Sequence, residues 1–271
     1  MPLSAAAPVR GPEREARLSQ QLSGCCFGGA VQAFQSCAST MELAHAWARE
    51  GAGEGALVWA ARQTQGRGRH GRVWESPEGG AYLSLILRPT RGAHESPQLA
   101  LVAGLAVAEA MYGLTRQSPS IRWPNDVLLD GNKVCGVLIE AKNGAVIVGI
   151  GINVTTPLRE LPETATSLAL THAASGVQSS EWISQLTGAL CRCFQASYER
   201  WTREGFAPIR QALRPWMGHF GQPVQVTMGA QRIEGIAHDL DESGRLLVRL
   251  DAGLLRAFEM GEVTLLRSVA R

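Results

Sequence analysis

The sequence lacks the cysteine and histidine patterns that bind metals or build disulfide frameworks. It has six cysteines and six histidines, but no C-x-x-C pair and no two histidines at a metal-ligand spacing. The cysteines are Cys25, Cys26, Cys37, Cys135, Cys191 and Cys193. We therefore predict reduced thiols, a cytoplasmic location and no metal site built from protein ligands.

The sequence also lacks the features of a membrane, secreted or strongly nucleic-acid-binding protein. Its longest apolar run, Leu99–Ala108, is too short for a bilayer, which needs ~20 residues. The N-terminal residues have no apolar signal core, and Glu13 and Glu15 weigh against a transit peptide. A net charge of +2 gives no general attraction to polyanions. We predict no membrane partner and no nucleic-acid partner.

What the chain does have is ample apolar material for a core. Hydrophobic residues make up 45% of its 271 residues and charged residues 18%, which argues against disorder. Residues 1–30 are expected to form a poorly ordered or weakly helical leader, with one short helix candidate over Pro12–Leu22. Because a helix-turn-helix needs two packed helices, we expect no DNA-binding domain there.

Helix and strand patterns predict a large α+β domain over residues 31–214. Helices are expected from Ser39, where Glu42 completes a capping-box pattern, from Ser96 with Pro97 in the first turn, and over Ser180–Arg203, ended by Gly205. Strands are expected over 55–64 and 80–89, and three more within 121–154, separated by turns at 130–132 and 143–144.

The pattern changes after Pro215. Four short strand candidates follow, separated by Gly, Asp and Ser turns, over 221–228, 232–241, 245–251 and 254–267. Such spacing is typical of a small β-barrel. Residues 215–271 are therefore predicted to be a second, all-β domain.

The segment QTQGRGRHGRVW, residues 63–74, combines glycines and arginines directly after an apolar strand. Gly66, Gly68 and Gly71 match the G-x-G-x-x-G dinucleotide fingerprint, which must open a helix. Ser76-Pro77 and the glycine pair at 79–80 forbid that helix, so we reject a Rossmann site. The chain also has no G-x-x-x-x-G-K-[ST] phosphate loop.

Three interpretations of this segment remain. The segment could be a solvated hairpin loop, since such loops often contain glycine and arginine. Three glycines would cost chain entropy on folding, however, and the like charges would repel, so this composition would gain such a loop little stability. An anion would offset both costs, because glycine lets backbone N–H groups approach phosphate and arginine adds bidentate hydrogen bonds. Single-stranded RNA would need a wider basic surface with stacking aromatics, which the near-neutral chain does not favour. The anion interpretation predicts a loop that becomes ordered when its ligand binds.

Three further segments have both a functional and a structural interpretation. RWPND, residues 122–126, is either a ligand-binding cluster or a turn. Lys133, three residues before Gly136, is either a reactive or a surface lysine. VGIGINV, residues 148–154, places glycines in a strand, where close approach of a ligand and a bulged core strand are both uses of glycine.

Together these segments closely resemble the biotin–protein ligases, also called biotin–acetyl-CoA-carboxylase ligases. The matching residues, in the family's order, are Ser39-Thr40, Gln63-Thr64, Gly66-Arg67-Gly68-Arg69-His70-Gly71-Arg72, Trp74, Trp123-Pro124-Asn125-Asp126, Lys133, Gly136, Gly149, Gly151 and Asn153. The resemblance runs from about residue 35 to the C-terminus. It implies a mixed β-sheet flanked by helices and an SH3-like C-terminal domain.

The resemblance also implies the chemistry: biotin and Mg-ATP give biotinyl-5′-AMP, and biotin then passes to one lysine of a biotin carboxyl carrier protein. Lys133 would lie between the biotin carboxylate and the α-phosphate. Arg67, Arg69 and Arg72 would lie on a loop that closes over both ligands and excludes water. Asp126 would lie on the nucleotide and magnesium side with Asn125, and is a candidate activator of the carrier lysine.

The remaining expected contacts concern biotin. Ser39, Thr40 and Gln63 would bind its urea and ring, and backbone around Gly136, Gly149 and Gly151 would line the slot for its tail. The family commonly has Asn where this chain has Met41, so that side-chain contact is expected to be lost or made by backbone. Arg122 replaces a lysine, which keeps the charge but not the shape.

Several alternatives stay open. A lipoate or octanoyl transfer enzyme of the same superfamily is the nearest, although those enzymes lack the Gly-Arg segment in this form. A biotin-binding protein without catalysis is another. The resemblance leaves a homodimer open, and the absence of a helix-turn-helix predicts a ligase without operator binding.

Overall fold

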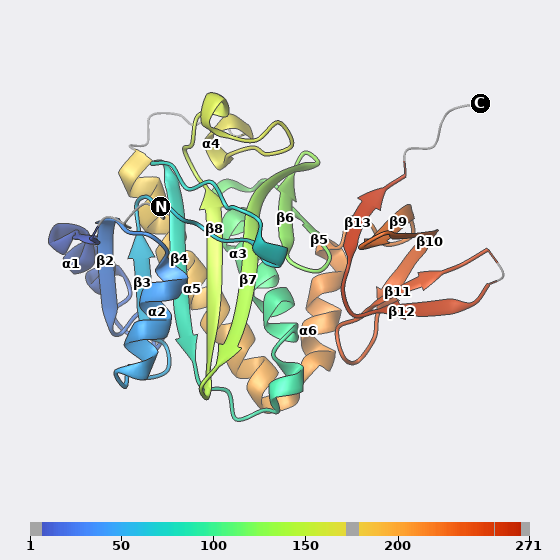
Figure 1. The fold of residues 1–271 in the computed structure, drawn as a ribbon, viewed down its shortest axis with the longest axis horizontal. Helices are drawn as coiled ribbons and strands as arrows, with labels where there is room; N and C mark the ends of the chain where they lie inside the picture. The colour runs from blue at the N-terminus through green and yellow to red at the C-terminus, as the bar shows by residue number, and fades with distance from the viewer. Residues whose placement is uncertain (1–6, 172–178, 252, 267–271) are drawn as a thin grey trace.

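The structure, a computed structural model, describes residues 7–171, 179–251 and 253–266. It consists of an eight-stranded mixed sheet with helices on both faces and a five-stranded antiparallel sheet formed by the C-terminal residues (Figure 1). The predicted fold class is therefore confirmed. The predicted domain boundaries at residues 30/31 and 214/215 stay predictions.

The element bounds are as follows. The large sheet contains β1 (Val9–Arg10), β2 (Val31–Ser36), β3 (Leu57–Ala60), β4 (Gly80–Leu87), β5 (Ser120–Arg122), β6 (Asp126–Leu129), β7 (Asn132–Lys142) and β8 (Ala145–Asn153). The helices are α1 (Pro12–Gln21), α2 (Thr40–Arg49), α3 (Gln98–Thr115), α4 (Leu168–Thr171), α5 (Ser179–Glu204) and α6 (Phe206–Leu213), with short 3-10 turns at Arg69–Gly71, Ala93–Glu95, Leu158–Glu160 and Arg214–Trp216. The small sheet contains β9 (Pro223–Met228), β10 (Gln231–Leu240), β11 (Leu246–Arg249), β12 (Leu255–Phe258) and β13 (Glu262–Leu265).

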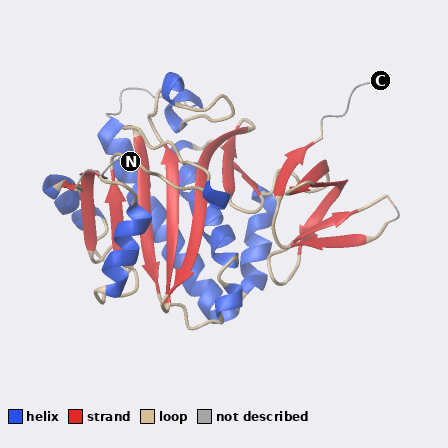
Figure 2. Cartoon of the chain, viewed as in Figure 1, coloured by secondary structure: helices blue, strands red, loops and turns tan. Residues whose placement is uncertain are grey.

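The large sheet has the strand order β1-β2-β3-β4-β8-β7-β6-β5, and only β2 and β3 pair in parallel. Helices α3 and α5 cover one face and α2 lies on the other, as Figure 2 shows. Of the helices in the described ranges, α3 alone is long and apolar enough to cross a membrane, yet 72% of it is buried. A helix that is apolar all round is expected in the middle of a core, which is its place here.

The predicted leader is folded over the residues that the structure describes. Strand β1 pairs with β2, and α1 packs against the sheet through Leu18 and Leu22, both 1% exposed. The guanidinium of Arg14 stacks over the buried Trp59 ring, 4.6 Å from its centroid. The weakly helical alternative for the leader, with its helix candidate over Pro12–Leu22, corresponds to α1, whose contacts are made with segments far along the chain. The assignment of residues 1–30 as a separate leader stays a prediction.

Two predicted helix starts are correct in position but not in capping. Ser39 precedes α2, and Ser96 comes two residues before α3, yet neither side chain makes a capping hydrogen bond. The hydroxyls of both are buried and have no partner among the described residues. The predicted contact of Ser39 with a ligand stays a prediction.

The C-terminal sheet has five strands in the order β12-β11-β10-β9-β13, one more than predicted. The extra strand arises because residues 254–267 bend at Gly261 (φ 145°) and split into β12 and β13. A left-handed or mirror-extended φ of this kind is accessible mainly to glycine.

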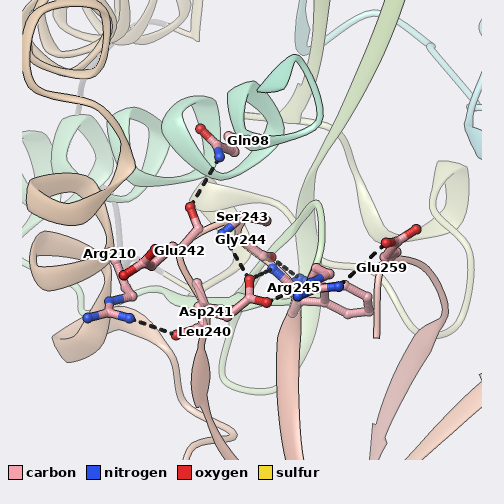
Figure 3. A network of polar contacts seen from close by, with 10 residues as sticks. Gln98, Arg210, Leu240, Asp241, Glu242, Ser243, Gly244, Arg245 and Glu259 are labelled. Carbon is pink, nitrogen blue, oxygen red and sulfur yellow. Dashed lines mark hydrogen bonds and ion pairs between the residues drawn. The ribbon is translucent and has the colours of Figure 1, made fainter. Parts of the chain in front are cut away.

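The turn between β10 and β11, residues 240–245, fastens the small sheet to the large domain (Figure 3). The Asp241 carboxylate accepts the amides of Ser243 and Arg245, which fixes the turn. The amide of Gln98 donates to the Glu242 carbonyl at 3.3 Å. The indole N–H of Trp123 donates to the Gly244 carbonyl at 3.0 Å, in a buried hydrogen bond. The turn thereby contacts the same loop that carries Asn125 and Asp126.

Candidate active site

A cavity of about 460 Å³ lies where β7 and β8, the 63–76 segment and β13 meet. It gathers almost every residue that the sequence singled out: Ser39, Thr40, Met41, Gln63, Arg67, Gly68, Arg69, Arg72, Trp74, Asn125, Asp126, Lys133, Gly136, Gly149, Gly151 and Asn153. Among the matching residues, Thr64, Gly66 and Gly71 do not line it. Gly66 is buried, and a Cβ there would overlap the Trp74 carbonyl oxygen.

Other residues that line the cavity carry no signal in the sequence. They come from the loop after β8 and from the C-terminal sheet, and include Leu161, Pro162, Thr164, Ala165, Gly261, Glu262, Val263 and Thr264. No local motif marks them, because their position depends on how distant segments pack. The backbone of Lys133 exchanges hydrogen bonds of 2.9 Å with Thr164 and Thr166, which is how the first of these loops reaches the cavity.

Residues 63–76, called the lid here, form a hairpin-like segment rather than a dinucleotide loop. Gln63 bridges to Ser76 and Arg67 bridges to Val73 in antiparallel fashion. The tip is a single 3-10 turn over Arg69–Gly71, in which His70 has a φ of 57°. No helix follows the tip, and the chain continues into β4.

Three lid arginines were predicted to be site residues, and each lies near an oxygen acceptor. Arg69 Nη1 donates to Asn125 Oδ1 at 3.0 Å, and Arg72 forms an ion pair with Glu262 of β13. Arg67 lies 3.9 Å from a Glu42 oxygen and 3.8 Å from a Glu140 oxygen. Burial lowers the pKa of the Arg69 guanidinium from its ordinary value, whereas the Asp126 and Glu262 carboxylates act in the opposite direction.

Lys133 lies in a compact charged group beside the lid. Its Nζ is 2.6 Å from Asp126 Oδ1, and Arg122 Nη2 donates to Asp126 Oδ2 at 2.7 Å. The Lys133 ammonium also lies 5.1 Å from the centroid of the Trp74 ring, within the range of a cation–π contact. One carboxylate thus holds two cations at the edge of the cavity, which leaves a net positive charge there.

Asn125 connects this group to the sheet. Its Nδ2 donates to the Val137 carbonyl at 2.9 Å, and its own carbonyl accepts the Val137 amide at 2.9 Å. Its side-chain oxygen is then left to accept from Arg69. The preceding Trp123-Pro124 bond is cis. The loop is therefore fixed at both its backbone and its side chains.

A series of hydrogen-bonded polar side chains forms the other end of the cavity. Gln63 Oε1 accepts the Thr40 amide at 2.8 Å and the Thr40 hydroxyl at 3.1 Å. Gln63 Nε2 donates to Ser76 at 2.9 Å, and Ser84 donates to the Thr40 hydroxyl at 2.8 Å. Ser39, beside this chain, is 1% exposed and its hydroxyl has no partner among the described residues.

The strand glycines make room for protein side chains in this structure. A Cβ on Gly136 or Gly151 would press on the Trp74 indole, and a Cβ on Gly149 would meet the Met41 sulfur at 2.5 Å. Met41 is itself buried against the sheet. Trp74 and Met41 therefore pack over the strand glycines, and the role of these glycines in a slot for a ligand tail stays a prediction.

Several buried polar atoms on the cavity wall have no partner among the described residues: Ser39 Oγ, Trp74 Nε1 and Asn153 Oδ1. Asp126 Oδ1 accepts no aligned hydrogen bond either, although Lys133 is close. Burying polar groups without partners costs free energy, so such groups together on one wall indicate a polar ligand.

The described residues contain no group of three or more His, Cys, Asp or Glu side chains that could hold a metal. Asp126 is the carboxylate at the predicted nucleotide side, and two cations already occupy it. The residues therefore do not form a metal cage. A magnesium ion that arrives with nucleotide phosphates needs no such cage, because Mg²⁺ keeps several waters and few protein ligands.

Known proteins resemble this chain over both parts. Residues 33–156 match the biotin/lipoate A/B protein ligase family, and residues 219–266 match the biotin protein ligase C-terminal domain. The chain is 37% identical over 219 residues to a biotin–acetyl-CoA-carboxylase ligase from Paracoccus denitrificans, covering 73% of this chain and 85% of the relative. It is 33% identical over 256 residues to the ligase of that name from Mycobacterium tuberculosis, covering 90% and 92%.

Among solved structures, a biotin protein ligase from Aquifex aeolicus in complex with biotin and ATP superposes with a TM-score of 0.76 and 32% identity. The match covers 88% of this chain and 99% of that one. Fold and cavity define the class as a ligase of the biotin/lipoate type. Within that class, the chain belongs to the biotin protein ligase family.

Proposed function

We propose that this protein activates biotin with Mg-ATP to biotinyl-5′-AMP and transfers the biotinyl group to one lysine of a biotin carboxyl carrier protein. The observation that carries the proposal is the single cavity that combines a polar end around Thr40 and Gln63 with a cationic end around Lys133 and the lid. The Aquifex relative, whose structure contains biotin and ATP, supports the assignment of ligands.

In the first step, a carboxylate oxygen of biotin attacks the α-phosphorus, and the bond to the β-phosphate breaks to release pyrophosphate. Both reactants are anions, so the barrier falls only where fixed positive charge meets the developing charge. We assign this role to Lys133, whose ammonium faces the cavity beside Trp74. Arg67 and Arg69 add charge from the lid.

In the second step, the amine of a carrier lysine attacks the acyl carbon, AMP leaves, and the amine loses a proton. Asp126 is our candidate to accept that proton. It must first exchange at least one of its contacts with Lys133 and Arg122, and arrival of the phosphates would draw both cations away. Until then its role is to position Lys133.

The lid would also protect the adenylate intermediate from water. A mixed anhydride is readily hydrolysed, so a cavity that closes over it favours transfer over loss. Residues from β13 take part in the closure through the contact of Glu262 with Arg72. We propose that biotin's urea lies at Ser39, Thr40 and Gln63, where the Ser39 hydroxyl has no partner among the described residues.

The test is a transfer assay with the full chain, Mg-ATP, labelled biotin and a biotin carboxyl carrier domain, read as a mass increase on the carrier's lysine. A parallel reaction with lipoate tests the other branch of the matched family. We expect modification with biotin and none with lipoate. Transfer of lipoate in place of biotin would refute the proposal, as would the absence of any pyrophosphate release with biotin.

A further inference from the structure

The lid arginines differ in how firmly they are held. Arg69 makes a direct hydrogen bond to Asn125, and Arg72 makes a close ion pair with Glu262. Arg67 lies between two carboxylates at 3.8 and 3.9 Å, too far for a hydrogen bond, and its side chain is 40% exposed. The attraction that holds Arg67 is therefore electrostatic and readily exchanged.

The two carboxylates belong to elements outside the lid. Glu140 lies on β7 and contacts His45 Nε2 of α2 at 2.7 Å. Glu42 lies in the first turn of α2, where a negative charge is favoured by the helix dipole. Neither residue lines the cavity. When Arg67 turns toward a ligand, these carboxylates remain with their own helix and strand.

The backbone of Arg67 is held as well. Arg67 bridges to Val73, and the amide of Trp74 donates to the Gly66 carbonyl at 3.0 Å. Gly66 leaves no room for a side chain beneath it. Exchange of partners at Arg67 is therefore mainly a movement of its side chain, between the acidic pair on one side and the cavity on the other.

We propose that Glu42 and Glu140, called the acidic pair here, are positioning residues that compete with the ligand's phosphate for Arg67 and so set how firmly the lid closes. A phosphate offers Arg67 two parallel charge-assisted hydrogen bonds, which the acidic pair does not. The phosphate therefore displaces the acidic pair from Arg67. Breaking those ion pairs reduces the free energy that the lid contributes to ligand binding. This inference rests on the proposed function, because it takes the ligand to be an adenylate.

The competition predicts the direction of the effect. Removing the acidic pair should strengthen binding of the adenylate, and the effect should depend on Arg67. Exposed ion pairs contribute about 0.2–1 kcal/mol each, so each substitution should slow adenylate dissociation by about 1.4- to 5-fold. The contact must be weak, because a strong ion pair would keep the Arg67 side chain from turning to the ligand.

The experiment compares Glu42→Gln, Glu140→Gln and the double variant in the full chain, with Glu50→Gln as the matched control. Glu50 is an exposed residue that directly follows α2, and it makes no contact with Arg67. Preformed biotinyl-adenylate is chased with excess biotin, and its dissociation rate is measured. We expect slower dissociation in the acidic-pair variants, an unchanged rate in the control, and no effect of Glu140→Gln when Arg67 is already alanine.

An unchanged or faster rate in the double variant would overturn the proposal, as would an effect that persists without Arg67. A second measurement separates this result from failure of the proposed function. Hydrogen exchange of the Gly68 and Trp74 amides, measured without ligand, should be faster in the acidic-pair variants than in Glu50→Gln, because the lid loses a tether. This measurement remains informative if the wild type forms no adenylate. Equal hydrogen-exchange rates in the acidic-pair variants and in Glu50→Gln would show that the acidic pair does not hold the lid.

Discussion

The hydrogen bond between Trp123 and the β10–β11 turn allows a quantitative test of how the C-terminal sheet is joined to the active-site loop. Trp123 is 2% exposed, and its indole N–H donates to Gly244 at 3.0 Å in a buried setting. Gly244 has a φ of 80°, and a Cβ there would meet Leu101 at 3.2 Å, so the turn has little freedom to find another donor. Trp123→Phe leaves this carbonyl buried and unpaired, which costs about 1–3 kcal/mol.

The chain offers a matched control in Trp59. It is 0% exposed, and its indole N–H has no partner among the described residues. Trp59→Phe removes the same atoms, and it breaks no hydrogen bond with the described residues, although it reduces the ring on which Arg14 stacks. We expect the free energy of unfolding in urea to be lower for Trp123→Phe than for Trp59→Phe by about 1–3 kcal/mol. Equal losses in the two variants would refute the reasoning.

Three further outcomes follow from the site. Lys133→Ala should slow pyrophosphate release by about 10²–10³-fold, because it removes the fixed charge nearest the reacting groups, and a wild-type rate would disprove its role. Arg69→Ala should speed loss of bound biotinyl-adenylate, measured by chase with unlabelled biotin, and an unchanged rate would contradict lid closure. Burial lowers the pKa of His219 from 6.5 to about 4, so the unfolded chain binds the proton first as the pH falls. Stability should therefore be complete above pH 6.5 and decline by about 3 kcal/mol toward pH 4, a slope that His219→Gln should flatten and that urea titrations at each pH would measure.

The sequence was a good guide to the parts of the site that lie close together along the chain. The lid, the loop 122–126 and the strand pair β7–β8 are each defined by local glycine, proline and charge patterns, and the structure brings them around one cavity. Their individual roles stay predictions. The rejection of a helix after the lid rested on Ser76-Pro77, and the chain does enter β4 directly.

What the sequence could not provide are contacts between distant segments. The folding of residues 7–30 depends on Leu18, Leu22 and the stacking of Arg14 on Trp59, and no periodicity in so short a segment indicates its partner. The part of Glu262 in the cavity depends on how the small sheet docks. The acidic pair was missed for the same reason, since Glu42 is explained locally as a helix-start residue and meets Arg67 only in the folded chain.

The position of Trp74 has an optical consequence. Its indole lies against Gly136 and Gly151, with the Lys133 ammonium above the ring, and its own N–H has no partner in the described part of the chain. A ligand that enters this slot must alter the polarity around one of the chain's seven tryptophans, which is itself part of the lid. Indole emission depends on nearby charge and solvent, so the protein contains an intrinsic fluorophore that reports whether the slot is filled, without any added dye.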